Sequence, residues 1–292
     1  MTKLIIILGV LSLSLSAIFL RLSSAPAAVM ALFRMIFATG LLLPFVLGKQ
    51  RKELARVRRR DVLLSVLSGA IFALHVSLYF AAIKRTSIAS STVLVNTEVF
   101  FVALIGMARG TERISVRLWL AMGAAFFGSV LIAMADAGSG GRLVGDLLAV
   151  LAALASAINT LIGKRARTRL TASVYSLILY AAATACLLAR CLVTRTPLFS
   201  WTLRDYLCAL GLAVFCTILG HSVFSWGLRF ERATFVSMAK LLEPVFATVT
   251  AVFLFREYPV PLQLLGGAAV ILGILWYIRL EGEEKPEVRP SE

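Results

Sequence analysis

Long apolar segments, separated by short polar links, run through the whole chain. Ten of these segments have about 17 to 23 residues, enough for a helix to cross a hydrocarbon layer of about 30 Å. By residue number they are 4–20, 27–47, 62–83, 88–107, 118–135, 147–163, 172–193, 206–228, 233–255 and 260–278. The pattern predicts an all-α polytopic membrane protein with ten transmembrane helices.

The charged residues are concentrated in the links. Only 15% of the residues are charged and 60% are hydrophobic, yet Lys and Arg outnumber Asp and Glu by 30 to 15. Ten crossings put both termini on one side, and the links on that side contain 20 Lys and Arg, against eight in the links on the other side. Cytoplasmic loops are the ones enriched in Lys and Arg. We therefore predict a protein of the plasma (inner) membrane with both termini in the cytoplasm and no nucleic-acid partner.

The two halves of the chain resemble each other in order. Three short matches recur about 140 to 146 residues apart: Ser16-Ala17-Ile18 with Ser156-Ala157-Ile158, Arg60-Asp61 with Arg204-Asp205, and Val99-Phe100 with Val245-Phe246. Since each half holds five segments, the second half enters the membrane from the opposite face, as in the inverted repeats of secondary transporters. The predicted organisation is two five-helix repeats at 1–136 and 145–279, a linker at 137–144 and a disordered cytoplasmic tail at 280–292. The first segment is expected to remain as a helix rather than be cleaved as a signal peptide, because the repeat includes it.

Residues in both halves match the pattern of one family. They are Phe33-Arg34 in the second segment, Gly145-Asp146 near the start of the second half, Leu241-Leu242-Glu243-Pro244-Val245-Phe246 in the ninth segment, and Glu257 and Gly273 beyond it. On these residues the chain resembles the EamA family of the drug/metabolite transporter superfamily, which consists of ten-helix permeases. The resemblance implies a central cavity surrounded by segments one, three, four, six, eight and nine. Two residues depart from the family pattern: Glu98 stands where the first repeat usually has proline, and Lys240 is not general in the family.

Four charged residues lie well inside apolar segments: Arg34, Glu98, Lys240 and Glu243. Each costs roughly 2.5–3.5 kcal/mol at a helix centre, so we expect all four to face protein or water. Lys240 and Glu243 are three residues apart on one helix, which favours an ion pair between them. Glu98 has no such partner on its own helix. It is therefore a candidate for ion coupling or substrate contact, and the alternative is a salt bridge to Arg34 or Lys240.

Polar and aromatic residues inside the segments are the other candidates for a binding site. His and Asn in a membrane helix usually face the interior of the bundle, although stripes of aromatic residues are also typical of packing cores. The predicted substrate-binding residues are His75, Tyr79, Asn96, Glu98, Asn159, His221, Trp226 and Lys240. Pro244 removes a backbone hydrogen bond, which predicts a bend that acts either as a gate or as a static kink.

These features favour a secondary transporter over other classes of membrane protein. We expect it to move a small metabolite, such as an amino acid or a similar polar or amphipathic solute, by alternating access, with export coupled to protons. The alternatives are an uncoupled facilitator or channel and, with less support, an intramembrane enzyme. An enzyme would need a nucleophile with its base or a metal motif such as HExxH, and the two histidines lie on different segments. Four cysteines have no metal-ligand spacing either, so we predict no catalytic residues, no metal and no cofactor, and a lipid bilayer and a small molecule as partners.

Overall fold

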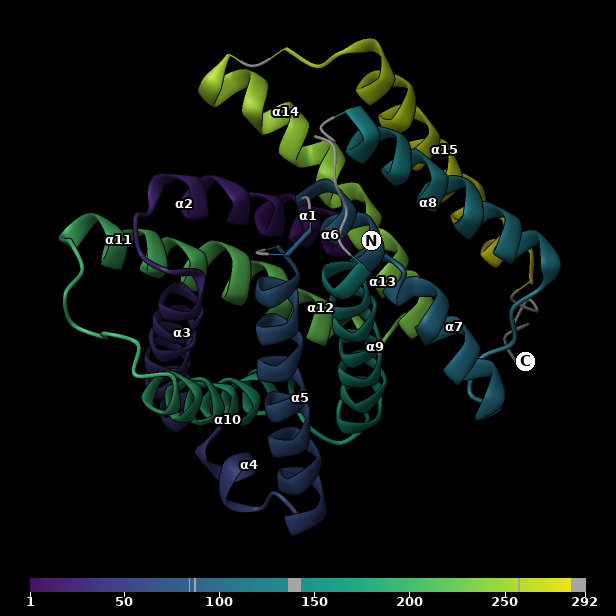
Figure 1. Ribbon diagram of the computed structural model, residues 1–292. Helices are drawn as coiled ribbons and strands as arrows, with labels where there is room; N and C mark the ends of the chain where they lie inside the picture. The colour runs from purple at the N-terminus through teal and green to yellow at the C-terminus, as the bar shows by residue number, and fades with distance from the viewer. Residues whose placement is uncertain (84, 87, 136–142, 257, 285–292) are drawn as a thin grey trace, which may run out of the picture.

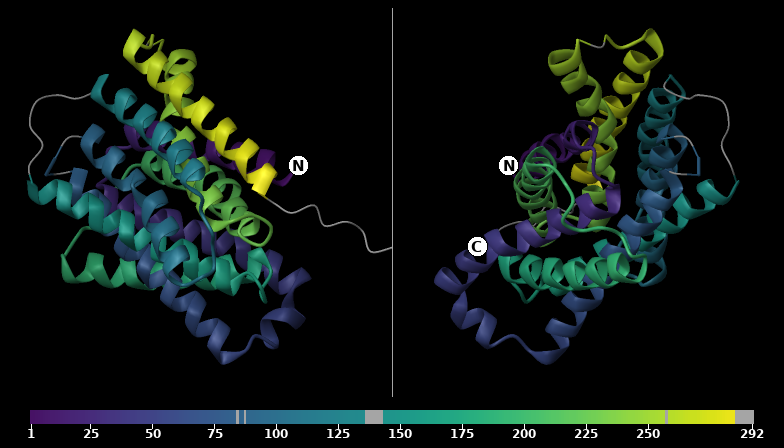
Figure 2. Two further views of the ribbon diagram at one scale, coloured as in Figure 1. Left: turned by 90° about the vertical axis from the view of Figure 1, so that its right-hand side faces the viewer. Right: turned by 60° about the vertical axis from the view of Figure 1, so that its left-hand side comes forward.

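The computed structural model describes residues 1–83, 85–86, 88–135, 143–256 and 258–284, which form a bundle of helices without strands (Figure 1). Within these residues, ten helical stretches are long and apolar enough to cross a membrane, so the predicted fold class is confirmed. Glu257, most of the predicted linker and residues 285–292 of the predicted tail lie outside the described residues. Residues 280–284 belong to helix α15, so the prediction of a disordered tail is wrong for them. The crossings in chain order are α1 (Thr2–Ser14) with α2 (Ser16–Leu22), α3 (Ala27–Lys49), α5 (Arg59–Ile83), α6 (Ile88–Asn96) with α7 (Glu98–Ala108), α8 (Val116–Ala135), α9 (Leu143–Ala166), α10 (Ala172–Val193), α11 (Leu203–Gly211) with η1 (Leu212–His221) and α12 (Ser222–Gly227), α13 (Ala233–Ala239) with η2 (Lys240–Leu242) and α14 (Glu243–Phe255), and α15 (Pro261–Glu284). The short helix α4 (Arg51–Ala55) joins α3 to α5 in a turn that protrudes from the bundle (Figure 2).

Four of these crossings are broken rather than continuous α-helices. The first breaks at Leu15, the fourth at Thr97, the eighth contains the ten-residue π-helix η1, and the ninth contains the 3-10 turn η2. At the fourth, the Thr97 hydroxyl donates to the Leu94 carbonyl at 2.6 Å, a local bond that competes with the helix ladder. At the ninth, the break lies just before Pro244, which has no N–H to donate. Side chains at or next to each of these breaks line a cavity inside the bundle.

Glycine lets α8 and α15 pack closely at one edge of the bundle, where the two helices lie side by side (Figure 1). A Cβ added at Gly128 would lie 2.5 Å from the Gly266 carbonyl oxygen, and one at Gly266 would lie 2.6 Å from the Gly128 carbonyl oxygen. A Cβ at Gly273 would lie 2.6 Å from the backbone nitrogen of Ala125. Each clash is with backbone, so only glycine allows this approach.

We expect Gly128→Ala to destabilise the protein by about 1–3 kcal/mol, the usual cost of an overpacked contact. Gly123 is a matched control on the same helix, because nothing lies within 4 Å of a Cβ placed there. Gly123→Ala should leave stability unchanged or raise it slightly, since alanine is the better helix former. Thermal unfolding of the two variants in the same detergent measures the difference, and equal melting temperatures would show that the close approach is unimportant.

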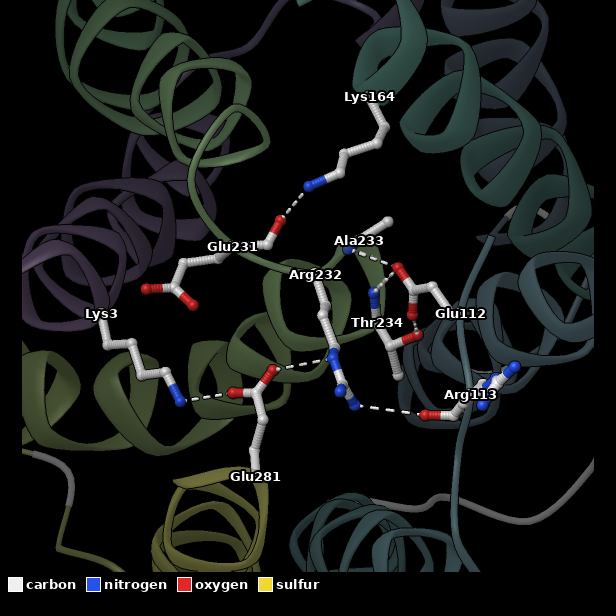
Figure 3. A network of polar contacts seen from close by, with 9 residues as sticks. All are labelled: Lys3, Glu112, Arg113, Lys164, Glu231, Arg232, Ala233, Thr234 and Glu281. Atoms are coloured by element: carbon white, nitrogen blue, oxygen red, sulfur yellow. Dashed lines mark hydrogen bonds and ion pairs between the residues drawn. The ribbon is translucent and has the colours of Figure 1, made fainter. Parts of the chain in front are cut away.

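Polar contacts join the links at one end of the bundle. At the end where the chain begins, Lys3 pairs with Glu281, and Arg232 Nε lies 3.4 Å from the other oxygen of that carboxylate (Figure 3). Arg232 also donates to the Arg113 carbonyl at 3.2 Å. The start of α1, the links that follow α7 and α12, and the end of α15 therefore meet at this end, which we call the terminal end. The sequence predicts that it is cytoplasmic.

Candidate functional site

A cavity of about 150 Å³ lies among the broken crossings. Each broken crossing contributes a residue at or beside its break, and α3, α5, α9 and α10 complete the wall. Irregular backbone at membrane depth is tolerated only where it is buried in protein or lines a water-filled space. The polar residues of the lining are Ser16, Arg34, His75, Tyr79, Thr92, Asn96, Glu98, Ser156, His221, Lys240 and Glu243.

Glu98, the first residue of α7, forms a buried ion pair with Lys240 in the wall of this cavity. Its two oxygens lie 2.8 and 3.1 Å from Lys240 Nζ, and Glu98 is only 5% exposed. Three hydroxyls also donate to the carboxylate: Ser156 Oγ at 2.6 Å, Thr160 Oγ1 at 2.9 Å and Ser237 Oγ at 3.1 Å. The carboxylate is thus fully supplied with donors from α9, α13 and η2, and the pair joins the two halves of the chain.

The ion pair of Lys240 differs from the one that helical spacing favoured. Lys240 lies on Glu98 and makes no ion pair with Glu243 among the described residues, so the prediction of a Lys240–Glu243 pair is wrong. Spacing along one helix carries no information about the helix beside it. Because α7 packs against α13, Glu98 and its hydroxyl donors come within reach of Lys240. The alternative in which Glu98 forms a salt bridge to Lys240 is the one found.

Arg34 and Glu243 line the same cavity without an ion-pair partner among the described residues. Arg34 Nε donates to the Thr217 hydroxyl of η1 at 2.6 Å, while its Nη2 is buried with no hydrogen-bond partner. Glu243 lies in the lining together with Ser16, whose hydroxyl is its neighbouring donor group. The cavity therefore contains a neutralised pair, Glu98 with Lys240, and two separate opposite charges.

The two histidines that the sequence singled out also line the cavity. His75 Nδ1 lies 2.9 Å from the Ala152 carbonyl, which can only accept, so Nδ1 carries a proton and Nε2 is left for another partner. The Tyr79 ring stacks on His75 at 6.4 Å between centroids. His221 packs edge-on against Phe72, with centroids 5.3 Å apart. The predicted residues of α5 and η1 thus form one aromatic wall.

The two predicted asparagines have different surroundings. Asn96, at the end of α6, lines the cavity, and its Nδ2 is buried without a hydrogen-bond partner. Asn159 is not part of the lining, because its Oδ1 accepts a bond from Ser68 at 2.6 Å in the contact of α5 with α9. Trp226 is not part of it either, since its ring lies against Phe230, 4.9 Å between centroids. As substrate-binding residues, Asn159 and Trp226 therefore stay predictions, and both lie outside the lining of this cavity.

Sequence reasoning overlooked Ser16, Ser156 and Thr217 as site residues. Ser16 and Ser156 line the cavity at matching places in the two halves, and Thr217 orients Arg34. A signal for the first two was present, because Ser16-Ala17-Ile18 and Ser156-Ala157-Ile158 are one of the internal matches. Thr217 has no comparable signal, since its position depends on the π-helix.

Comparison with known proteins identifies the family. The EamA-like transporter family matches residues 1–134 and 143–279, which is nearly the whole chain. The chain belongs to the EamA-like transporter family. This EamA-like protein is therefore an integral membrane transporter and not an enzyme.

Individual relatives agree with this assignment. An uncharacterised transporter from Archaeoglobus fulgidus is 26% identical over 274 residues, which are 92% of this chain and 93% of that protein. A pseudopaline exporter from Pseudomonas aeruginosa is 27% identical over 256 residues, which are 87% of this chain and 86% of the exporter. One crystal structure superposes with a TM-score of 0.81 over 98% of this chain and 99% of its own, at 17% identity, which shows a shared fold.

Proposed function

We propose that the protein is a secondary transporter that exports a small metabolite, such as an amino acid or a similar polar or amphipathic solute, by alternating access coupled to protons. The observation that carries the proposal is the cavity, which is walled by four broken crossings and holds two charges without ion-pair partners. Broken helices around a site near the membrane midplane are typical of secondary transporters. The similarity to a pseudopaline exporter supports export of a small molecule. In this proposal the protein lies in the plasma (inner) membrane, and both of its termini face the cytoplasm.

Contacts at the two ends of the bundle support the proposal of two inverted five-helix repeats. Asp61, at the start of α5, lies 3.8 Å from Arg169 in the link between α9 and α10. Asp205, at the start of α11, accepts bonds of 2.7 Å from the Ser23 hydroxyl and the Ser24 amide in the link between α2 and α3. In both contacts, the aspartate that begins the third crossing of one half meets the link after the first crossing of the other half. The two contacts lie at opposite ends of the bundle. Rocking of two such halves about the cavity is the motion that alternating access requires.

Of the two carboxylates that line the cavity, Glu243 is better suited than Glu98 to exchange a proton during the cycle. Protonation of Glu98 would have to displace Lys240 and three hydroxyl donors. Glu243 lines the cavity and has Ser16 as its neighbouring donor. We therefore assign the coupling proton to Glu243 and an architectural role to the Glu98–Lys240 pair.

Transport by proteoliposomes under an imposed pH gradient tests this proposal. With each of the twenty radiolabelled amino acids as the solute, at least one should be accumulated against its gradient by wild-type protein. Glu243→Gln should abolish the accumulation and leave only equilibration, because glutamine carries no exchangeable proton of this kind. Transport by wild-type protein that ignores every pH gradient would favour the uncoupled facilitator. No movement of any of these solutes would count against the proposed substrate range.

A further inference from the structure

The four charges at membrane depth are unequal in their surroundings. Glu98 and Lys240 satisfy each other, but Arg34 and Glu243 have no ion-pair partner among the described residues although both line one cavity. An unpaired charge at this depth is costly, and proteins neutralise it with another charge or a ligand. The cavity thus has one positive and one negative wall, and neither charge makes a direct ion-pair contact within the described residues.

The positive wall is preorganised to receive an anionic group. Arg34 is fixed by its Nε bond to Thr217, and Thr217 is itself held because its carbonyl accepts a bond of 3.2 Å from the Tyr180 hydroxyl. Arg34 Nη2 and Asn96 Nδ2 are both buried donors with no hydrogen-bond partner. A guanidinium binds a carboxylate through two parallel hydrogen bonds, which makes carboxylate the chemistry best matched to this wall.

The negative wall is Glu243, at the first position of α14. Its neighbour Ser16 can satisfy one oxygen, and the nearest cation on the same chain segment, Lys240, is already engaged by Glu98. A carboxylate accepts from several donors at once, so an ammonium group with three N–H donors can satisfy it. The cavity that both walls line has a volume of about 150 Å³, which suits one small molecule that supplies both charges.

We propose that the cavity recognises a dipolar solute at both ends, with its carboxylate on Arg34 and Asn96 and its ammonium group on Glu243. This inference rests on the proposed transport function and names the charge pattern of the substrate. A solute with a single charge would leave one of the two walls unneutralised, so the site selects for both groups together. The apolar part of the lining, which includes Met30, Phe72 and Phe80, receives the remainder of the molecule.

Thermal-shift titration of the purified protein in detergent tests this recognition, since a ligand that binds the folded state raises the melting temperature. Each of the twenty amino acids is compared with its N-acetyl form, which lacks the ammonium group, and its methyl ester, which lacks the carboxylate. At least one free amino acid should stabilise the protein, and each of its two derivatives should bind at least about 30-fold more weakly.

Two isosteric or near-isosteric variants separate recognition from a structural role. Arg34→Gln should weaken binding of the free amino acid until it binds no more tightly than its methyl ester. Glu243→Gln should likewise make the free amino acid bind no more tightly than its N-acetyl form. If either variant instead weakens all three forms equally, the assignment of that residue is overturned. If the three forms bind alike to the wild-type protein, or if no amino acid binds, the inference fails. Proton-driven export of some other solute in proteoliposomes would then still support the transporter, so the two failures are distinguishable.

Discussion

Replacing Glu98 with alanine is expected to destabilise the protein by about 3–5 kcal/mol, because Lys240 would be left buried without a counter-charge. Three hydroxyls, those of Ser156, Thr160 and Ser237, would also lose their acceptor. Thermal unfolding in detergent, followed by size-exclusion chromatography for the folded fraction, measures the effect. Lys240→Ala should have a similar cost for the complementary reason.

The double variant Glu98→Gln with Lys240→Met is the control that separates charge from packing. Replacing a buried ion pair by uncharged side chains of similar volume is often neutral or stabilising. We therefore expect the double variant to recover most of the loss, and the double-mutant cycle with the single variants Glu98→Gln and Lys240→Met reports the coupling energy. If Glu98→Ala melts at the wild-type temperature, the pair does not hold the halves together. If the double variant is no more stable than Glu98→Ala, the uncompensated charge of Lys240 is not the cause of the loss.

The crossings of the bundle could be predicted from sequence because they depend on one local property, the length of an apolar run. The predicted segment 172–193 coincides with α10, Ala172–Val193. A break within a crossing could be predicted from sequence only where a single residue causes it directly, as Pro244 does beside η2. The π-helix η1 has no proline and no other local signal in its sequence, Leu212–His221.

The sequence predicted which charged residues lie in the candidate site better than it predicted which of them form ion pairs. Arg34, Glu98, Lys240 and Glu243 stand out because charge is rare in apolar runs, and all four line the cavity. Which charge faces which depends on contacts between α7, α9 and α13, which no spacing along one helix describes. Asn159 shows the same limit, because it meets Ser68 of a neighbouring helix and is satisfied there.

Helix α13 and the polar contacts beside it lie between the cavity wall and the terminal end of the bundle. All seven residues of α13 are buried, and it extends about 10 Å from Lys240 in the cavity wall to Ala233 at the terminal end. Glu112 caps its start, accepting a bond of 2.7 Å from the Ala233 amide and another from the Thr234 hydroxyl (Figure 3). Glu281, fully buried, holds Lys3 and Arg232 beside it. We expect solute passage at this end to require movement of α13, and such movement would break these contacts.

Glu281→Gln is therefore expected to shift the protein toward a state that is open at the terminal end. Loss of a buried carboxylate that serves two cations weakens the closed state, and a change of about 1.4 kcal/mol would give a tenfold change in its population relative to the open state. The measurement is the maleimide labelling rate of Ser237→Cys, a buried residue of α13, in a background without native cysteines. The rate should rise about tenfold in Glu281→Gln. Glu283→Gln is the matched control, because Glu283 lies two residues further along α15 in an exposed pair with Arg279 that contributes little. Equal labelling rates in the two variants would show that Glu281 does not hold this end closed.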